Sequence, residues 1–392
     1  MPERSAERWR MLALVAFAEL LGMSLWFTAS SVAPQLRELW SLSVAQTAAL
    51  TTAVQVGFVV GTALAAVANL ADLWPSRQYF AVSAVLAAAA NVALLWAPGF
   101  ASAVALRFAT GFLLAGVYPP AMKMIATWFK SARGLAIGTV VGALTVGKAA
   151  PYLLGALGGA ELGPVVGWSS AAALLAGAAV ALGYRDGPHA FPRRPFSWRL
   201  ATGVLAHRPT RLAVGGYLGH MWELYAMWTW TPAFVAASLA ARGVTTPGLG
   251  DLLSFGAIAA GGLGCVWGGW AADRIGRGPL VTWAMAASGA CCLLAVLCFG
   301  ASPWILALLT WTWGFFVVAD SAQLSAMVTE VAPPHAVGTA LTLQTSLGFL
   351  LTTVTIQWVP ELADAWGWRW AFPVLALGPA VGILAIRRLK LR

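Results

Sequence analysis

The stretch ELLGMSLW at residues 19–26 recurs as ELYAMWTW at residues 223–230. Both copies keep a glutamate, a leucine, a methionine and a tryptophan at the same spacing. Further pairs follow at a near-constant offset of roughly 200 residues, such as Gly167-Trp168 and Gly367-Trp368. The chain is therefore predicted to consist of two repeats with the same orientation.

The composition indicates that the chain folds in a lipid bilayer. Hydrophobic residues make up 60% of the 392 positions and charged residues 10%, whereas soluble domains carry about 25% charged residues. This excludes a water-soluble globular protein and leaves an all-α integral membrane protein. The first apolar run extends from Met11 to Val32 with no small-residue cleavage pattern, so we expect it to be retained as a span.

The apolar segments predict twelve transmembrane helices in two six-helix bundles. Lysine and arginine gather on the side of the termini, while the opposite loops hold Arg37, Arg242 and Arg369. By the positive-inside rule, both termini are expected in the cytoplasm, with the chain in the plasma (inner) membrane. The predicted spans are 11–32, 47–69, 78–97, 102–124, 134–157, 168–184, 212–238, 250–271, 279–300, 303–328, 337–358 and 368–386.

The longest polar stretch divides the chain into its two halves. It contains several prolines and arginines and predicts a cytoplasmic linker over residues 185–211, between halves at 1–184 and 212–392. Transporters built from such repeats bind substrate at the interface between the halves. The expected partners are thus a small-molecule substrate, protons and the bilayer, and we expect a monomer.

Several other functions are not supported by the sequence. The net charge of +10 comes from basic residues in loops, so we expect no nucleic-acid partner. The four cysteines lie inside apolar spans, without the spacing of a metal site or a disulfide framework. No phosphate-cradling GxxxxGK[ST] loop is present, which argues against an ATP-driven pump. We therefore expect no enzyme activity, no cofactor and no metal.

Two loop motifs resemble the signature of the major facilitator superfamily. Residues 269–278 read GWAADRIGRG, which is similar to that family's Gly-x-Leu-Ala-Asp-Arg-x-Gly-Arg-Arg loop, and residues 70–77 read LADLWPSR, with proline in place of the glycine. Arg107-x-x-x-Gly111 is similar to a second signature of the family. The resemblance implies twelve helices, transport by alternating access, and a central cavity lined by spans 1, 4, 7 and 10.

The loop motifs predict a gate. An aspartate at a helix end can pair with a nearby arginine or cap a neighbouring helix, and so hold two helices together in one transport state. The alternative is an ordinary tight turn with a charge at headgroup level. The predicted gate residues are Asp72, Arg77, Asp273, Arg274 and Arg277.

Five charged residues fall inside predicted spans, where each costs at least about 2.5 to 3.5 kcal/mol at mid-bilayer. They are Glu19, Arg107, Lys148, Glu223 and Asp320. The three acids are predicted to face one low-dielectric cavity, which favours protonation of at least one carboxyl and suits proton coupling. Of the two repeated glutamates, we expect Glu19 to be the main proton carrier and Glu223 to act mainly in substrate binding. The alternative for each glutamate is a hydrogen bond inside its own half.

The predicted substrate-binding residues are Arg107, Lys148, His220, Tyr225 and Trp230. Arg107 and Lys148 lie in the same half and can bind a carboxylate or another oxyanion. Arg107 can instead be a structural residue of its motif, and His220 a packed neutral imidazole. The leading hypothesis is a proton-coupled transporter of a small anionic or zwitterionic solute. The alternatives are a proton-coupled exporter of hydrophobic or cationic compounds, and a non-transporting receptor or assembly factor on the same fold.

Overall fold

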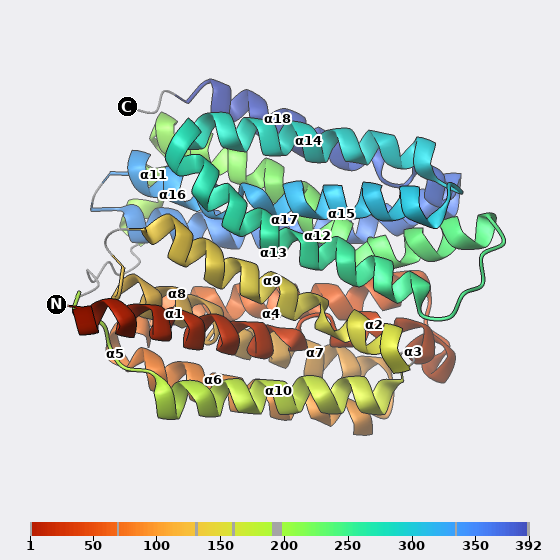
Figure 1. Cartoon of the computed structure of the whole chain (residues 1–392), viewed down its shortest axis with the longest axis horizontal. Helices are drawn as coiled ribbons and strands as arrows, with labels where there is room; N and C mark the ends of the chain where they lie inside the picture. The colour runs from red at the N-terminus through yellow and green to blue at the C-terminus, as the bar shows by residue number, and fades with distance from the viewer. Residues whose placement is uncertain are drawn as a thin grey trace.

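The computed structural model describes residues 2–68, 70–129, 132–158, 161–189, 198–333 and 335–389. Over these ranges the regular elements are helices, with no strand. The helices run roughly parallel to one long axis, and both chain ends lie at the same end of the bundle (Figure 1). We call this the terminal end and the other the far end. The all-α membrane fold expected from the sequence is confirmed.

The first half occupies the lower part of Figure 1. Its longer elements correspond to the predicted spans, and short helices such as α3 and α5 lie at the bundle ends. The elements are α1 (Pro2–Gly22), η1 (Met23–Leu25), α2 (Thr28–Ser31), α3 (Ala33–Trp40), α4 (Val44–Val67), α5 (Leu70–Leu73), α6 (Ser76–Val92), η2 (Ala93–Trp96), α7 (Phe100–Leu114), α8 (Tyr118–Ala126), α9 (Arg133–Gly158) and α10 (Leu162–Gly183).

The second half lies above the first in the same view. Helix α11 falls inside the segment predicted as a linker, of which residues 190–197 lie outside the described ranges. The elements are α11 (Trp198–Ala206), α12 (Arg208–Ala241), α13 (Leu249–Ile275), α14 (Arg277–Cys298), α15 (Pro303–Ala319), α16 (Ser321–Val331), α17 (Val337–Trp366), η3 (Trp368–Trp370), η4 (Pro373–Ala376) and α18 (Leu377–Arg387).

Ten helical segments in the described residues are long and apolar enough to cross a membrane. The other two predicted spans correspond to α1, which begins with charged residues, and to α12, which carries polar and aromatic side chains along its length. For these two segments, spanning remains a prediction that their place in the bundle supports (Figure 1).

Glycines let helices within each half pack backbone against backbone. A Cβ on Gly111 of α7 would lie 1.9 Å from the carbonyl oxygen of Val54 in α4, and one on Gly314 of α15 would lie 1.6 Å from that of Ala257 in α13. Small residues at such contacts are typical of membrane helices, which associate by close packing because lipid supplies no hydrophobic driving force.

Two seams join the halves. Along the first, α9 packs on α13, and a Cβ on Gly142 would lie 2.7 Å from the carbonyl oxygen of Gly262. Along the second, α4 meets α17 nearer the far end, where Gln357 Nε2 donates to Thr52 Oγ1 at 3.1 Å and Thr352 Oγ1 donates to Gln55. The first seam is thus a close backbone contact, and the second is held by side-chain hydrogen bonds.

Candidate functional site

A central cavity of about 810 Å³ lies between the two halves. Spans 1, 4, 7 and 10 all contribute to its wall, as the resemblance implied. Toward the terminal end of the bundle, the wall is formed by residues in the first or last turns of their helices, so the cavity opens at that end. These residues are Ala66, Ala126, Ile137, Thr329 and Gly338, and the inner end is lined by Met23, Trp26, Lys148, Tyr225, Trp228 and Phe349.

Three of the four cavity spans are interrupted helices. Span 1 ends as an α-helix at Gly22 and continues through η1 and α2, span 4 breaks between α7 and α8, and span 10 breaks at Asp320 between α15 and α16. The span predicted over residues 11–32 is therefore built from more than one helical segment. Broken helices expose backbone groups that can bind polar partners near the middle of a membrane.

Arg107 stabilises the break in span 1. Its Nη2 donates to the carbonyl oxygens of Leu25 at 2.9 Å and Trp26 at 2.6 Å, and its Nη1 donates to Asn91 Oδ1 at 2.8 Å. The side chain is buried inside the first half and is not part of the cavity wall. The structure does not bring Arg107 and Lys148 together, and it matches the alternative of a structural residue, because the guanidinium bonds carbonyls that the broken helix leaves unpaired.

Lys148 lies at the inner end of the cavity, among aromatic rings from both halves. The preceding residue, Gly147, lets α9 touch α1, since a Cβ there would lie 2.0 Å from the carbonyl oxygen of Leu20. Lys148 Nζ donates to Tyr225 Oη at 2.6 Å. It also lies 4.1, 4.9 and 5.3 Å from the ring centroids of Trp26, Tyr225 and Trp228. Cation–π attraction thus stabilises the ammonium group.

Glu19 lies in α1, one turn before Met23, and is fully buried behind the cavity wall. Among the described residues, no donor bonds either of its carboxylate oxygens. Lys148 and Tyr118, which both line the cavity, lie within electrostatic range of it. A buried carboxylate needs a proton or a nearby cation to be stable, so Glu19 requires either its own proton or the charge of Lys148.

Glu223 occupies the matching position of the second repeat but has a different environment. Its carboxylate accepts hydrogen bonds from Ser288 Oγ at 2.9 Å, Cys292 Sγ at 3.2 Å and Trp313 Nε1 at 2.5 Å. These donors lie on α14 and α15, inside the second half, and Glu223 does not line the cavity. The structure thus places Glu223 as the alternative had it, hydrogen-bonded inside its own half by three donors.

His220, Asp320 and Ser321 form a polar group on the second-half wall. His220 Nδ1 lies 2.9 Å from Asp320 Oδ1, and His220 Nε2 lies 2.9 Å from Ser321 Oγ. His220 and Ser321 line the cavity, whereas Asp320 lies behind them at the break of span 10. The structure therefore places His220 where the sequence predicted, but does not bring Asp320 to the same site as Glu19.

The two aromatic residues predicted to touch substrate differ in position. Tyr225 lines the cavity and bonds Lys148. Trp230 lies outside the wall, donating from Nε1 to the carbonyl oxygen of Ile356 at 2.8 Å. The structure does not bring Trp230 to the cavity, because its indole N–H joins α12 to α17. Trp26 and Trp228, which the sequence reasoning missed, are both in the wall, and the position of Trp26 in the repeated octapeptide was the available signal.

The two arginines of the second-half gate motif contact groups other than Asp273. Arg277 Nε pairs with Glu330 at 2.7 Å and its Nη1 bonds Gln323, while Arg274 stacks 3.8 Å over the ring of Trp270. Asp273 faces the start of α9, because a Cβ on the glycine at position 134 would lie 3.6 Å from both of its carboxylate oxygens. Asp273 thus lies across the seam from the start of the neighbouring helix, and its role in a gate stays a prediction.

In the first-half copy of the motif, Arg77 is exposed in α6. The backbone of Asp72 belongs to α5, and its side chain lies outside the part of the chain that the structure describes.

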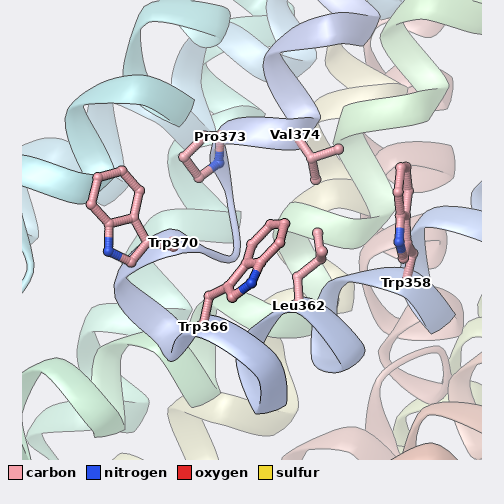
Figure 2. Close-up of a pocket in the computed structure, with 6 residues that line it drawn as sticks. All are labelled: Trp358, Leu362, Trp366, Trp370, Pro373 and Val374. Carbon is pink, nitrogen blue, oxygen red and sulfur yellow. The ribbon is translucent and has the colours of Figure 1, made fainter.

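A separate groove of about 620 Å³ lies near the far end, formed by the end of α17 together with η3 and η4 (Figure 2). Its lining is apolar and contains no titratable side chain among the described residues. This groove shares no lining residue with the central cavity. Its tryptophans fit the role of anchors at a membrane–water interface. The lining residues are Trp358, Leu362, Trp366, Trp370, Pro373 and Val374.

Comparisons with known proteins agree with this architecture. A solved structure of a bacterial homologue of the human lysosomal transporter Spinster, in an inward-facing and unoccupied conformation, has a TM-score of 0.71 to this chain. The two are 15% identical, and the match covers 97% of each chain, so the likeness concerns the fold. No curated protein matches the sequence. The family model described as Major Facilitator Superfamily matches residues 12–351, and this chain belongs to that family of membrane transporters.

Proposed function

We propose that the protein is a proton-coupled transporter of a small organic anion with an apolar body. The observation that carries this proposal is the chemistry of the cavity wall. Among the described lining residues, the charged or titratable groups other than tyrosine are basic, and none is aspartate or glutamate. They are Lys123, Lys148, His220 and Arg277, set among aromatic and aliphatic side chains. Arg277 and His220 already face Glu330 and Asp320, so an anionic head fits Lys148 best, and an apolar body fits the aromatic and aliphatic wall.

The proposed proton coupling depends on Lys148, whose positive charge can pair either with Glu19 or with the substrate anion. Lys148 can neutralise the carboxylate of Glu19 or the anion of a substrate, but its single charge cannot fully compensate both. When a proton binds Glu19, the ammonium of Lys148 is available to the substrate. Proton and anion binding therefore favour one another, as proton–anion symport requires.

The orientation is part of the same proposal. The basic residues gathered at the terminal end favour placing that end, and the cavity mouth, in the cytoplasm, with the chain in the plasma (inner) membrane. Alternating access then requires the α4–α17 contacts of Thr52 and Gln55 to separate while the mouth closes. Labelling of a single introduced cysteine at the mouth, from one side of intact cells, tests this orientation.

Flux measurements test the proposed activity. In proteoliposomes, an imposed pH gradient is expected to drive accumulation of an aromatic organic anion such as phenylbutanesulfonate, which stays ionised at every pH used. Equal flux with and without the gradient would reject proton coupling. Binding without flux would favour a receptor or assembly factor.

One observation favours a second candidate, an exporter of cationic compounds. The rings around Lys148 hold an ammonium group, and the same rings can hold the amine of a substrate if the lysine moves away. This candidate predicts that phenylbutylamine is transported and that Lys148→Ala improves its binding.

A further inference from the structure

Within the described part of the chain, two buried tryptophans at the inner end of the cavity have no hydrogen-bond acceptor. Trp26 is 0% exposed and Trp228 is 2% exposed, and neither indole Nε1 has a partner among the described residues. Buried indole N–H groups usually find an acceptor. Five other tryptophans of this chain do so through Nε1, namely Trp128, Trp222, Trp230, Trp311 and Trp313.

The two unpaired indoles occur together rather than scattered through the fold. Both rings line the cavity, and both lie within 5.3 Å of Lys148 Nζ, measured to their ring centroids. Tyr225 accepts the bond from Lys148, so its hydroxyl hydrogen remains for another acceptor. The inner end thus gathers one ammonium and three neutral donors. A buried donor that makes no hydrogen bond destabilises the protein by the free energy of its lost hydration.

We propose that this inner end is a binding site for the oxyanion head of the substrate, formed by Lys148, Trp26, Trp228 and Tyr225. A carboxylate or sulfonate would accept from the two indoles and pair with the ammonium, while the apolar body extends along the wall past Phe349. The proposal rests on the proposed function and specifies which end of the substrate binds where.

The site is divided between the halves. Trp26 and Lys148 belong to the first half, and Trp228 and Tyr225 to the second. A bound oxyanion would therefore link the two halves through charge-assisted hydrogen bonds, which are stronger than bonds between neutral groups. The matching residue of the repeat, Trp230, has its indole engaged by α17, so the second half contributes Trp228 in its place.

The test compares head groups and then removes single donors. Four probes share one ring and chain: phenylbutyrate, phenylbutanesulfonate, phenylbutylamine and phenylbutanol. Affinity is measured from the rise in unfolding temperature with ligand concentration, since a ligand that binds the folded state stabilises it. For the wild-type protein, we expect both anions to bind at least tenfold more tightly than the amine and the alcohol. This ranking needs no variant and therefore does not depend on the folding of any mutant.

Trp26→Phe and Trp228→Phe keep a ring beside Lys148 and remove one N–H each. We expect each to weaken anion binding about tenfold, the effect of losing one charge-assisted bond, with phenylbutanol binding unchanged. Trp230→Phe is the matched control, because its indole donates outside the cavity, and should leave anion affinity within twofold. Wild-type anion affinity in both cavity variants, or tighter binding of the amine than of the anions, would overturn the site. Loss of proton-driven flux with this binding pattern intact would overturn only the coupling.

Discussion

Arg107→Ala is expected to destabilise the protein strongly, because the side chain supports the break in span 1. The substitution leaves three buried acceptors without their donor: Asn91 Oδ1 and the carbonyl oxygens of Leu25 and Trp26. An unmade buried hydrogen bond costs about 1 to 3 kcal/mol. The two carbonyls share one nitrogen and so count as little more than one bond. With about two unmade bonds, we therefore expect a loss of about 2 to 6 kcal/mol in the free energy of unfolding.

The measurement is unfolding in mixed micelles with rising dodecyl sulfate content, followed by circular dichroism. Arg107→Lys keeps the charge but lacks the planar fork that reaches both helices, so an intermediate loss is expected. Arg77→Ala is the control, since Arg77 is exposed and its removal should change stability by less than about 0.5 kcal/mol. A fully stable Arg107→Ala protein that no longer binds anions would refute the reasoning and return Arg107 to the binding site.

Three further predictions concern the repeat, the gate and the packing. Glu19→Gln should abolish pH-driven flux in proteoliposomes while keeping exchange, whereas Glu223→Gln should mainly lower stability, by about 1 to 3 kcal/mol; identical behaviour of the two would contradict the assignment. Asp273→Asn should slow exchange between transport states, seen by stopped-flow fluorescence, with substrate affinity within a few-fold; normal turnover with lost binding would argue against a gate. Gly314→Ala should cost at least about 1 to 3 kcal/mol because its methyl group meets the backbone of α13, while Gly163→Ala, with open space around it, should not.

Much of the fold follows from local sequence features. The apolar composition, the repeated octapeptide and the DRIGR loop can each be read from the sequence without knowing which helices touch, and they predicted the all-α membrane fold and the family. The short interruption of span 1 was not predicted, because its stabilising partner, Arg107, comes from a distant helix. Apolar periodicity alone does not distinguish a broken span from a continuous one.

The site was predicted in part, and the structure differs from the prediction where a side chain bonds to a helix that is distant in sequence. The sequence placed Glu19, Lys148, His220 and Tyr225 in the membrane, and the structure gathers the last three in the cavity wall with Glu19 directly behind it. Glu223 was expected to behave like its repeat partner. Its environment differs because its hydrogen-bond donors lie on other helices, at positions that the repeated segment does not include.

The tryptophans show the same limitation. Whether an indole N–H is paired depends on the carbonyl that faces it, which a single sequence does not reveal. Trp230 bonds to α17, whereas Trp228, two residues earlier and on another face of α12, lines the cavity and has no N–H partner among the described residues.

Proton uptake on anion binding tests the central claim most directly. Purified protein in a weakly buffered solution with a pH indicator is mixed with phenylbutanesulfonate, whose own charge does not change with pH. If Lys148 is shared between Glu19 and the substrate, binding should draw about one proton per anion onto the wild-type protein. Glu19→Gln should bind the anion with no uptake. Binding without proton uptake by the wild type, or equal uptake by Glu19→Gln, would contradict the account.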